Sequence, residues 1–256
     1  MQYSRNTKSS SGCEGYYNES EKGYILMIGI IGAMAVEIEG IREKMTDKTE
    51  KTVSGITYVR GYLNGCETVT AVCGIGKVFA AICAQTMILE FSPELIINTG
   101  VAGSLSSSLN VCDIAVADRV VQHDMDTSPL GDPKGLISGI NKVYIDADKS
   151  IGALLSEIAS DEGVNTVLGT IASGDCFVAS KELKERIASD FGAIACEMEG
   201  ASIGQVCYVN NVPFSVLRAI SDKADGVAEI DYPAFCKMAA DNYIKVICGF
   251  AKRYAR

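Results

Sequence analysis

The stretches that decide the fold are Ala195-Cys196-Glu197-Met198-Glu199-Gly200-Ala201 and Val216-Leu217-Arg218-Ala219-Ile220-Ser221-Asp222. Each is an apolar, strand-like run that stops abruptly on carboxylates. A third acid, Glu37, follows the apolar run 28–34. Open α/β sheets bind ligands at the carboxyl ends of their strands, so these acids are predicted to face a cleft. Because the chain has a single histidine, three carboxylates at strand ends indicate acid chemistry on a small polar substrate.

Outward from these stretches, short β-branched runs alternate with helical patterns. Strands are predicted near 28–34, 68–73, 95–98, 114–121, 167–172 and 214–220, and helices over 36–45, 78–91, 149–162, 181–190, 201–210 and 233–254. Strands separated by helices imply a mixed or parallel sheet that is covered on both faces. The predicted fold class is therefore α/β, with one domain over residues 24–256 and a central mixed β-sheet flanked by helices on both faces.

Two segments depart from this alternation. Residues 1–23 are polar and lack periodicity, and we expect a disordered polar extension there; Met27 would also serve as an initiator. Residues 123–144 form a long irregular loop that contains Pro129, Gly131 and Pro133. Loops of that length are usually functional or interfacial.

Composition narrows the class of partner. The net charge of -9 disfavours nucleic acid, because phosphate binding relies on Lys and Arg. The longest apolar run, 25–36, is too short to span a bilayer, which needs about 20 residues, so no membrane partner is expected. The ten cysteines are scattered without a Cys-x-x-Cys pair, which favours reduced core thiols and a cytoplasmic protein. Asp124 and Asp126 share a strand face beside His123, but further ligands are lacking, and we expect neither a metal nor a cofactor.

Six segments occur in order with a specific joint pattern: IGIIGAMAVEIE at 28–39, CGIGKVFAA at 73–81, IINTGVAGSL at 96–105, SGDCFVAS at 173–180, ACEMEGASI at 195–203 and RAISDKAD at 218–225. Together they resemble the 5′-methylthioadenosine/S-adenosylhomocysteine nucleosidases of the purine nucleoside phosphorylase superfamily. The resemblance covers essentially everything after Ile25 and implies a nucleoside phosphorylase-like fold. It also implies hydrolysis of an N-glycosidic bond in an adenine nucleoside.

The resemblance assigns roles position by position. It makes Glu37 the group that activates the attacking water and Asp222 the general acid at the leaving purine, with Ser221 as its positioning partner. Glu199 would hold the ribose hydroxyls, with Met198 packed under the sugar. The remaining substrate-binding positions are Phe177 and Val178 at the adenine, Met34, Ile75, Tyr232 and Phe235 around the 5′-thio substituent, and Ala102 and Gly103 in a glycine turn whose backbone approaches the ligand.

The loop at 123–144 is implied to reach the active site of a partner subunit in a homodimer. Thr127 and Leu130 are the candidate contacts. Members of the family often carry Phe at the position of Leu130, and some carry Ser at the position of Val101. Both departures bear on substrate preference rather than on the type of reaction.

The assignment also makes chemical sense without the resemblance. Cleavage of an N-glycosidic bond produces a cationic sugar and an anionic purine unless the purine is protonated. An acid on the base side, and a carboxylate with a water on the opposite face of the sugar, meet both needs. Each residue nevertheless has a plainer alternative: Ser221 and Asp222 as turn caps, Glu199 at a helix N-terminus, Glu37 on a solvated helix face, and Phe177 in the core.

Other functions remain as alternatives. A phosphorolytic relative would need arginines near 33–37 and 97–100, where this chain has none, and Glu37 would repel phosphate. A nucleosidase for AMP would need a basic 5′ pocket in place of the apolar residues. A nucleosidase for aminofutalosine, and a non-catalytic nucleoside-binding module, stay open.

Overall fold

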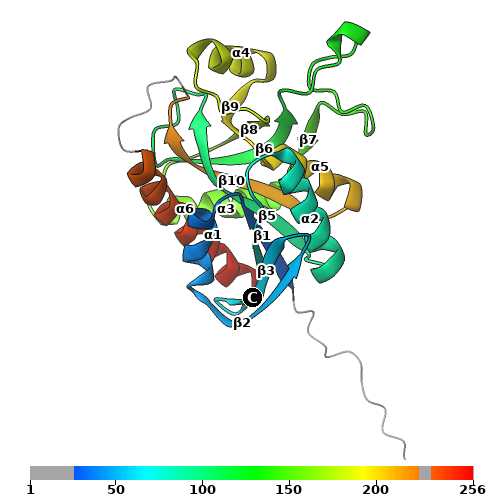
Figure 1. Cartoon of the computed structure of the whole chain (residues 1–256). Coiled ribbons are helices and arrows are strands. Elements are labelled where there is room, and N and C mark those ends of the chain that lie inside the picture. Colours follow the sequence, from blue (N-terminus) through cyan, green and yellow to red (C-terminus); the bar gives the residue numbers. More distant parts are fainter. Residues whose placement is uncertain (1–25, 225–231, 256) are drawn as a thin grey trace, which may run out of the picture.

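The computed structural model describes residues 26–224 and 232–255, with the backbone alone for 232–239. It is a three-layer α/β arrangement in which one sheet lies between two sets of helices (Figure 1). The predicted fold class is confirmed. The expected extension 1–23 lies outside the described residues, as do the side chains of Tyr232 and Phe235.

Parallel strands form the middle of the sheet. β1 (Met27–Gly32) lies between β4 (Cys66–Val72) and β5 (Leu95–Ser104), and β5 also pairs in parallel with β10 (Phe214–Asp222). These strands are almost entirely buried, as expected where helices cover both faces. Their carboxyl ends therefore lie at one edge of the sheet, which is where the predicted site residues occur.

The rest of the sheet is mixed. β6 (Ile114–Gln122) pairs antiparallel with β10 and parallel with β8 (Thr166–Ser173), and β9 (Ala193–Glu197) links β8 back to β5. The pairings β5–β10–β6–β8–β9–β5 thus form a closed circuit. β7 (Tyr144–Asp146) extends the sheet beyond β6.

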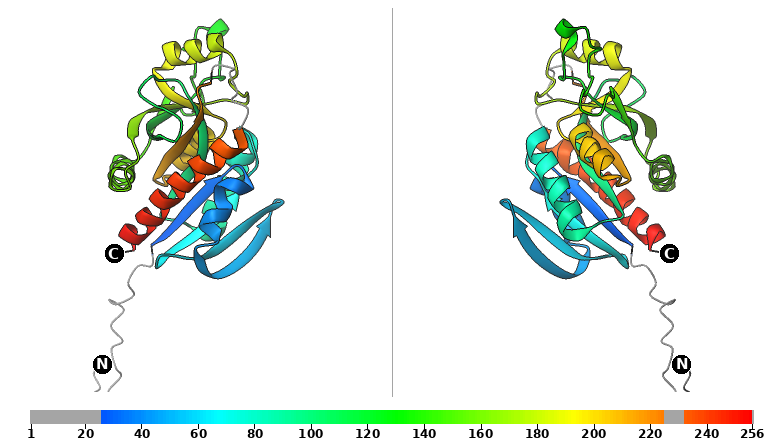
Figure 2. Two further views of the ribbon diagram at one scale, coloured as in Figure 1. Left: turned by 90° about the vertical axis from the view of Figure 1, so that its left-hand side faces the viewer. Right: turned by 90° about the vertical axis from the view of Figure 1, so that its right-hand side faces the viewer.

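The helices lie on opposite faces of this sheet. α2 (Lys77–Phe91) and α5 (Gly200–Asn210) contribute to one hydrophobic core. α1 (Ala35–Arg42), α3 (Lys149–Asp161) and α6 (Tyr232–Tyr254) contribute to the other. Figure 2 shows α6 across one face and α2 with α5 across the other. α4 (Lys181–Phe191) packs on a smaller third cluster.

The hairpin of β2 (Met45–Val53) and β3 (Ile56–Leu63) was not predicted. Most of β2 is exposed and polar, because it is the outer strand, so it lacks the apolar alternation of a half-buried strand. The signal lay instead in the turns. Ser54-Gly55 and Asn64-Gly65 all have positive φ, as two-residue hairpin turns require. The hairpin also ends the first helix at Arg42, earlier than the predicted 45.

The segment after β6 is less irregular than expected. It contains the short 3-10 helix η2 (Ser128–Leu130) and a bridge between Ile137 and Lys142. Figure 1 shows this green segment extending away from the body of the molecule. Ile137 of this segment packs in the core of its own chain. In the part of the chain that the structure describes, no helix is long and apolar enough to cross a membrane.

Candidate active site

A pocket with about 630 Å³ of empty space, part of it open to solvent, lies at the carboxyl ends of the strands, where open α/β sheets bind ligands. It collects residues that follow or end β1, β4, β5, β8, β9 and β10. The predicted residues that line it are Met34, Glu37, Ile75, Ala102, Gly103, Phe177, Val178, Met198, Glu199, Ser221 and Asp222. The strand-end carboxylates are therefore brought together, although they are distant in the sequence.

Glu37 lies in the first turn of α1 and is 2% exposed. One carboxylate oxygen accepts hydrogen bonds from the backbone N–H groups of Ala33 (2.7 Å) and Met34 (2.9 Å), and the other accepts from that of Val101 (3.1 Å). The alternative of a solvated helix face is therefore wrong for Glu37. Three donors fix its carboxylate at the boundary between β1, α1 and β5.

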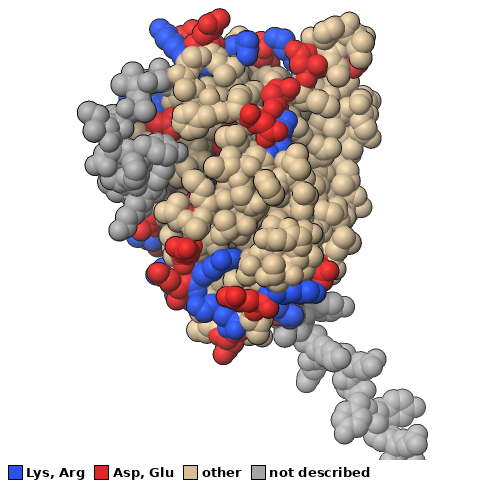
Figure 3. All heavy atoms as spheres, viewed as in Figure 1, with Lys and Arg blue, Asp and Glu red and all other residues tan. Residues whose placement is uncertain are grey.

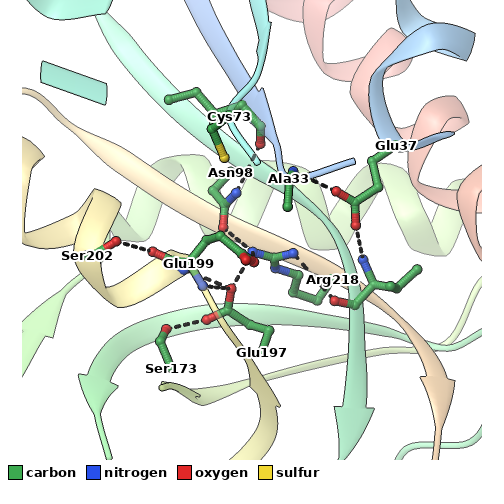
Figure 4. Close-up of polar contacts among 12 residues, drawn as sticks. Ala33, Glu37, Cys73, Asn98, Ser173, Glu197, Glu199, Ser202 and Arg218 are labelled. Carbon is green, nitrogen blue, oxygen red and sulfur yellow. Dashed lines mark hydrogen bonds and ion pairs between the residues drawn. The ribbon is translucent and has the colours of Figure 1, made fainter. Parts of the chain in front are cut away.

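The bottom of the pocket is polar and is formed by Glu37, Glu197, Glu199 and Arg218. Arg218 lies at its centre, and no role in the site was predicted for it from the sequence. It comes from the middle of β10, is 1% exposed, and donates to Glu197, Glu199 and the side-chain oxygen of Asn98. Figure 4 shows its guanidinium between the two glutamates on one side and Glu37 on the other. A charge inside an otherwise apolar strand was the available signal, because a buried charge needs partners.

Glu197 caps the start of α5. It accepts hydrogen bonds from the backbone N–H groups of Glu199 (2.9 Å) and Gly200 (2.8 Å), and from the hydroxyl of Ser173. These contacts satisfy orphan donors at the helix N-terminus. The side chain that stabilises this helix N-terminus is therefore that of Glu197, and not that of Glu199 as the alternative had it.

The carboxylate of Glu199 is directed into the pocket. It accepts hydrogen bonds from the backbone N–H of Gly76 (2.9 Å) and from Arg218 (3.3 Å). Burial raises the pKa of Glu199 to about 7; Arg218 counteracts this effect, and neighbouring Glu197 adds to it. The balance favours the protonated carboxyl more than in an exposed glutamate, because burial outweighs an Arg218 charge shared with Glu197.

Ser221 and Asp222 end β10 on the opposite side of the pocket floor. The Ser221 hydroxyl donates to Asp222 Oδ2 (2.8 Å), and Asp222 Oδ1 accepts from the backbone N–H of Ala224 (2.7 Å). A Cβ added at Gly103 would lie 3.1 Å from Asp222 Oδ1. The absence of a side chain at Gly103 therefore leaves the Asp222 carboxylate open to the pocket.

The mouth of the pocket is apolar. Phe177 is 63% exposed and Ile75 is 57% exposed, and both line the pocket. The core alternative for Phe177 is therefore wrong. Large exposed apolar side chains around a polar floor are typical of a site for a ligand with one apolar part.

The sequence also missed four other lining residues, which are Ala33, Cys176, Cys196 and Glu197; Val101, expected to bear on substrate preference, does line the pocket. Thr127 and Leu130 do not line the pocket. Thr127 donates to Asp132 (2.8 Å), and Leu130 is 83% exposed. Within residues 26–224 and 240–255, no group of His, Cys, Asp and Glu side chains is arranged to hold a metal ion.

Comparisons with known proteins give the family. The phosphorylase superfamily matches residues 27–252. A 5′-methylthioadenosine/S-adenosylhomocysteine nucleosidase of Staphylococcus aureus is 41% identical over 215 residues, which are 84% of this chain and 94% of the relative. One of Haemophilus influenzae is 40% identical over 216 residues, with the same shares. The chain belongs to the 5′-methylthioadenosine/S-adenosylhomocysteine nucleosidase family.

Solved structures of this family agree in fold. A Helicobacter pylori nucleosidase with butyl-thio-DADMe-Immucillin-A superposes with a TM-score of 0.86 at 38% identity, over 90% of this chain and 99% of that one. A futalosine hydrolase of Helicobacter pylori gives a TM-score of 0.85 at 39% identity, over 90% and 98%. The resemblance inferred from the six sequence segments is thus confirmed.

Proposed function

We propose that the chain hydrolyses the N-glycosidic bond of 5′-methylthioadenosine and S-adenosylhomocysteine, releasing adenine and the 5-thio-ribose. The observation that carries this proposal is the convergence of Glu37, Glu199 and Asp222 in one pocket. Carboxylates at separate points of a pocket can serve the water, the sugar and the leaving base at the same time. Family membership supports the same reaction.

In this mechanism Glu37 takes a proton from the attacking water. Its three backbone hydrogen bonds hold the carboxylate without a side-chain cation in direct contact. An oriented base of this kind needs little reorganisation when the sugar develops positive charge. Asp222, oriented by Ser221, would donate a proton to the departing adenine.

Glu199 would accept the ribose hydroxyls, with Met198 below the sugar. Phe177 would lie against adenine, and the backbone of Val178 would read the edge of the base. Met34 and Ile75 would surround the 5′-thio substituent, and Ala102 with Gly103 would let the backbone approach the ligand. Tyr232 and Phe235 are proposed for the same 5′ pocket from the family resemblance alone.

The charges of the site favour water over phosphate as the nucleophile. The arginine in the pocket, Arg218, is engaged by Glu197, Glu199 and Asn98, and Glu37 lies close to it. Phosphate recognition uses arginine forks that are free to engage its oxygens. Three carboxylates around one guanidinium leave a net negative floor, which repels phosphate.

A second candidate is a futalosine-type nucleoside. The observation that favours it is the 39% identical futalosine hydrolase with the same fold. Its bulkier 5′ substituent would extend past Met34 and Ile75, the residues proposed around the 5′ position. The reaction at the glycosidic bond would be the same.

We also propose a homodimer in the cytoplasm. An apolar surface covers α2 and α5 and consists of Val78, Phe79, Ile82, Leu89, Tyr208 and Val209, all exposed. Figure 3 shows a broad uncharged area over α2 between charged bands. Exposed apolar patches of this kind mark interaction sites. The protruding Thr127 and Leu130 would then reach the partner.

The proposed location in the cytoplasm rests on the cysteines. Those in the described part of the chain are free thiols, which suits a reducing compartment.

Product analysis tests the reaction. The enzyme is given 5′-methylthioadenosine in phosphate-free buffer and again with added phosphate. We expect adenine and a free reducing sugar at the same rate in both. Phosphate dependence with a sugar-1-phosphate product would show a phosphorylase, and release of no adenine would contradict the proposal. Aminofutalosine in the same assay tests the second candidate.

A further inference from the structure

Three strand-end loops meet at a charged cluster beside the pocket, formed by Lys77, Asp124 and Asp175. Asp124, just after β6, accepts from Lys77 Nζ (2.7 Å) and from the backbone N–H of Asp175 (2.8 Å). Asp175, just after β8, accepts from the backbone N–H of Lys77 (2.8 Å). Each acid thus bonds the backbone or side chain of another loop, and the cluster ties the three loops together.

The cluster is more buried and has more hydrogen bonds than an isolated ion pair on the surface. The Lys77 side chain is only 17% exposed, and it also donates to Gln122 (3.1 Å). Partial burial acts to raise the pKa of Asp124, but hydrogen bonds from Lys77 and Asp175 lower it on balance, so the carboxylate stays ionised. An isolated exposed pair contributes little, whereas charge-assisted bonds to backbone N–H groups are about twice as strong as neutral ones.

The loop after β8 depends on this cluster. Its first residues are held by the backbone bond from Gly174 to Glu197 (3.1 Å) and by the bonds of Asp175. Among the described residues, no hydrogen bond holds 176–178. Phe177 is mostly exposed. Val178 packs in the third hydrophobic cluster, so the anchors at Gly174 and Asp175 fix the chain on one side of Phe177 and this packing fixes it on the other.

The cluster also touches the other side of the pocket. Lys77 opens α2, and the preceding Gly76 donates its N–H to Glu199. Gly76 has a φ of 99°, and a Cβ there would lie 3.1 Å from Asp175 Oδ1. The loop that carries Phe177 and the loop that holds Glu199 are thus fixed against each other by the same two acids.

We propose that Asp124 is a positioning residue for base recognition, which it sets by holding the 174–178 loop, through Asp175 and Lys77, against the start of α2. The inference rests on the proposed function for the identity of the base, adenine. Asp124 itself touches no substrate in this scheme. Its effect appears in how tightly the base is bound, because contacts made equally before and during reaction change KM rather than kcat.

The experiment compares the whole protein with Asp124→Ala, Asp175→Ala and Asp175→Asn. The matched control is Asp118→Ala, which removes an exposed acid of β6 that makes no side-chain hydrogen bond or ion pair in the described part of the chain. Steady-state kinetics with 5′-methylthioadenosine, adenine binding by calorimetry, and hydrogen exchange of the peptide 174–180 are measured on each. Thermal melts verify that each variant is folded.

Asp124→Ala and Asp175→Ala should each raise KM and weaken adenine binding by about tenfold or more, with kcat changed by less than about threefold. A variant that carries both Asp124→Ala and Asp175→Ala should be impaired more than either single one, because Asp175→Ala leaves the bonds to Asp124 in place, whereas Asp124→Ala leaves the bond from the Lys77 N–H to Asp175. Asp175→Asn keeps an acceptor for the Lys77 N–H and should restore most of the affinity. Asp118→Ala should match the wild type.

Hydrogen exchange separates the two proposals. Faster exchange of 174–180 in Asp124→Ala, but not in Asp118→Ala, supports the anchoring of the loop even if the wild type cleaves no nucleoside. Unchanged exchange in Asp124→Ala overturns the inference. In an active enzyme, the inference is also overturned if Asp124→Ala binds adenine as the wild type does.

Discussion

Glu37 and Arg218 approach the same point above Gly100 from opposite sides. A Cβ at Gly100 would collide with Glu37 Oε1 and with Arg218 Nη1, and Gly100 has a φ of 151°. Only glycine leaves room there for both side chains, so Gly100 lets the water-activating carboxylate and the buried guanidinium lie on the two sides of the same strand position.

Replacement of Glu37 by Gln should lower kcat by about 10²–10⁴-fold, the usual contribution of a general base. The stability of the fold should also fall. A Gln amide presents N–H donors to at least one of the three backbone N–H groups that Glu37 accepts. We expect a loss of about 1–3 kcal/mol in the free energy of unfolding, measured by denaturant titration. A near-normal kcat would remove Glu37 from the mechanism.

Asp222→Asn should lower kcat by a similar factor, and Ser221→Ala by about fivefold, since it removes one hydrogen bond worth about 1 kcal/mol. The deficit should depend on the leaving group. A riboside of 4-nitrophenol needs no protonation to depart, so Asp222→Asn should cleave it almost as well as the wild type. Glu37→Gln should remain impaired on the same substrate. Equal impairment of Asp222→Asn on both substrates would argue against general acid catalysis.

The sequence predicted most of the framework, because buried parallel strands and amphipathic helices leave clear local patterns. All six helices were placed within a few residues, apart from the end of α1. The β2–β3 hairpin was missed because its outer strand contacts solvent and its sequence reads as polar. Alternation of apolar and polar residues occurs only in strands with one buried face, so it cannot identify a strand that is exposed on both faces.

For the site, the strand-end position of Glu37, Glu199 and Asp222 was readable because strand direction brings such ends to one edge. Arg218 was visible as a charge in an apolar strand, but its partners were not readable, since Asn98 comes from β5 and Glu197 and Glu199 come from the end of β9 and the residues just after it. The same applies to the pKa of Glu199. Its rise depends on burial and on the partners of Arg218, neither of which is local in sequence.

Ligand binding should release a proton from Glu199. Its pKa of about 7 in the free enzyme should fall when ribose hydroxyls donate to it, because hydrogen bonds to the charged form favour that form. About half a proton should be released at pH 7 and almost none at pH 9. Calorimetry of an adenine nucleoside analogue in two buffers of different ionisation enthalpy measures this number. Glu199→Gln should show no release, and an unchanged release in that variant would contradict the assignment.

The raised pKa of Glu199 also makes the free energy of unfolding depend on pH. The native state holds the Glu199 proton more tightly than the unfolded state, whose value is near 4.5. Below pH 4.5 both states are protonated and no penalty exists; between pH 4.5 and 7 the wild type loses stability as pH rises. The stability of Glu199→Gln relative to the wild type should therefore increase over this window by a few kcal/mol at most, at about 1.4 kcal/mol per pKa unit.

The apolar surface of α2 and α5 allows a test of the dimer that spares the monomer. Val78, Ile82 and Leu89 are spaced by four and seven residues and so lie on one side of α2, with no charged residue between them. Val78→Asp places an acid in the first turn of α2, where the helix dipole favours it, so the fold should be kept. Light scattering should show the wild type as a dimer and Val78→Asp as a monomer, with activity lost because Thr127 and Leu130 no longer reach a partner. Leu168→Asp, at an exposed apolar position of β8, serves as the control and should stay dimeric. A fully active monomer would show that each subunit has a complete site of its own.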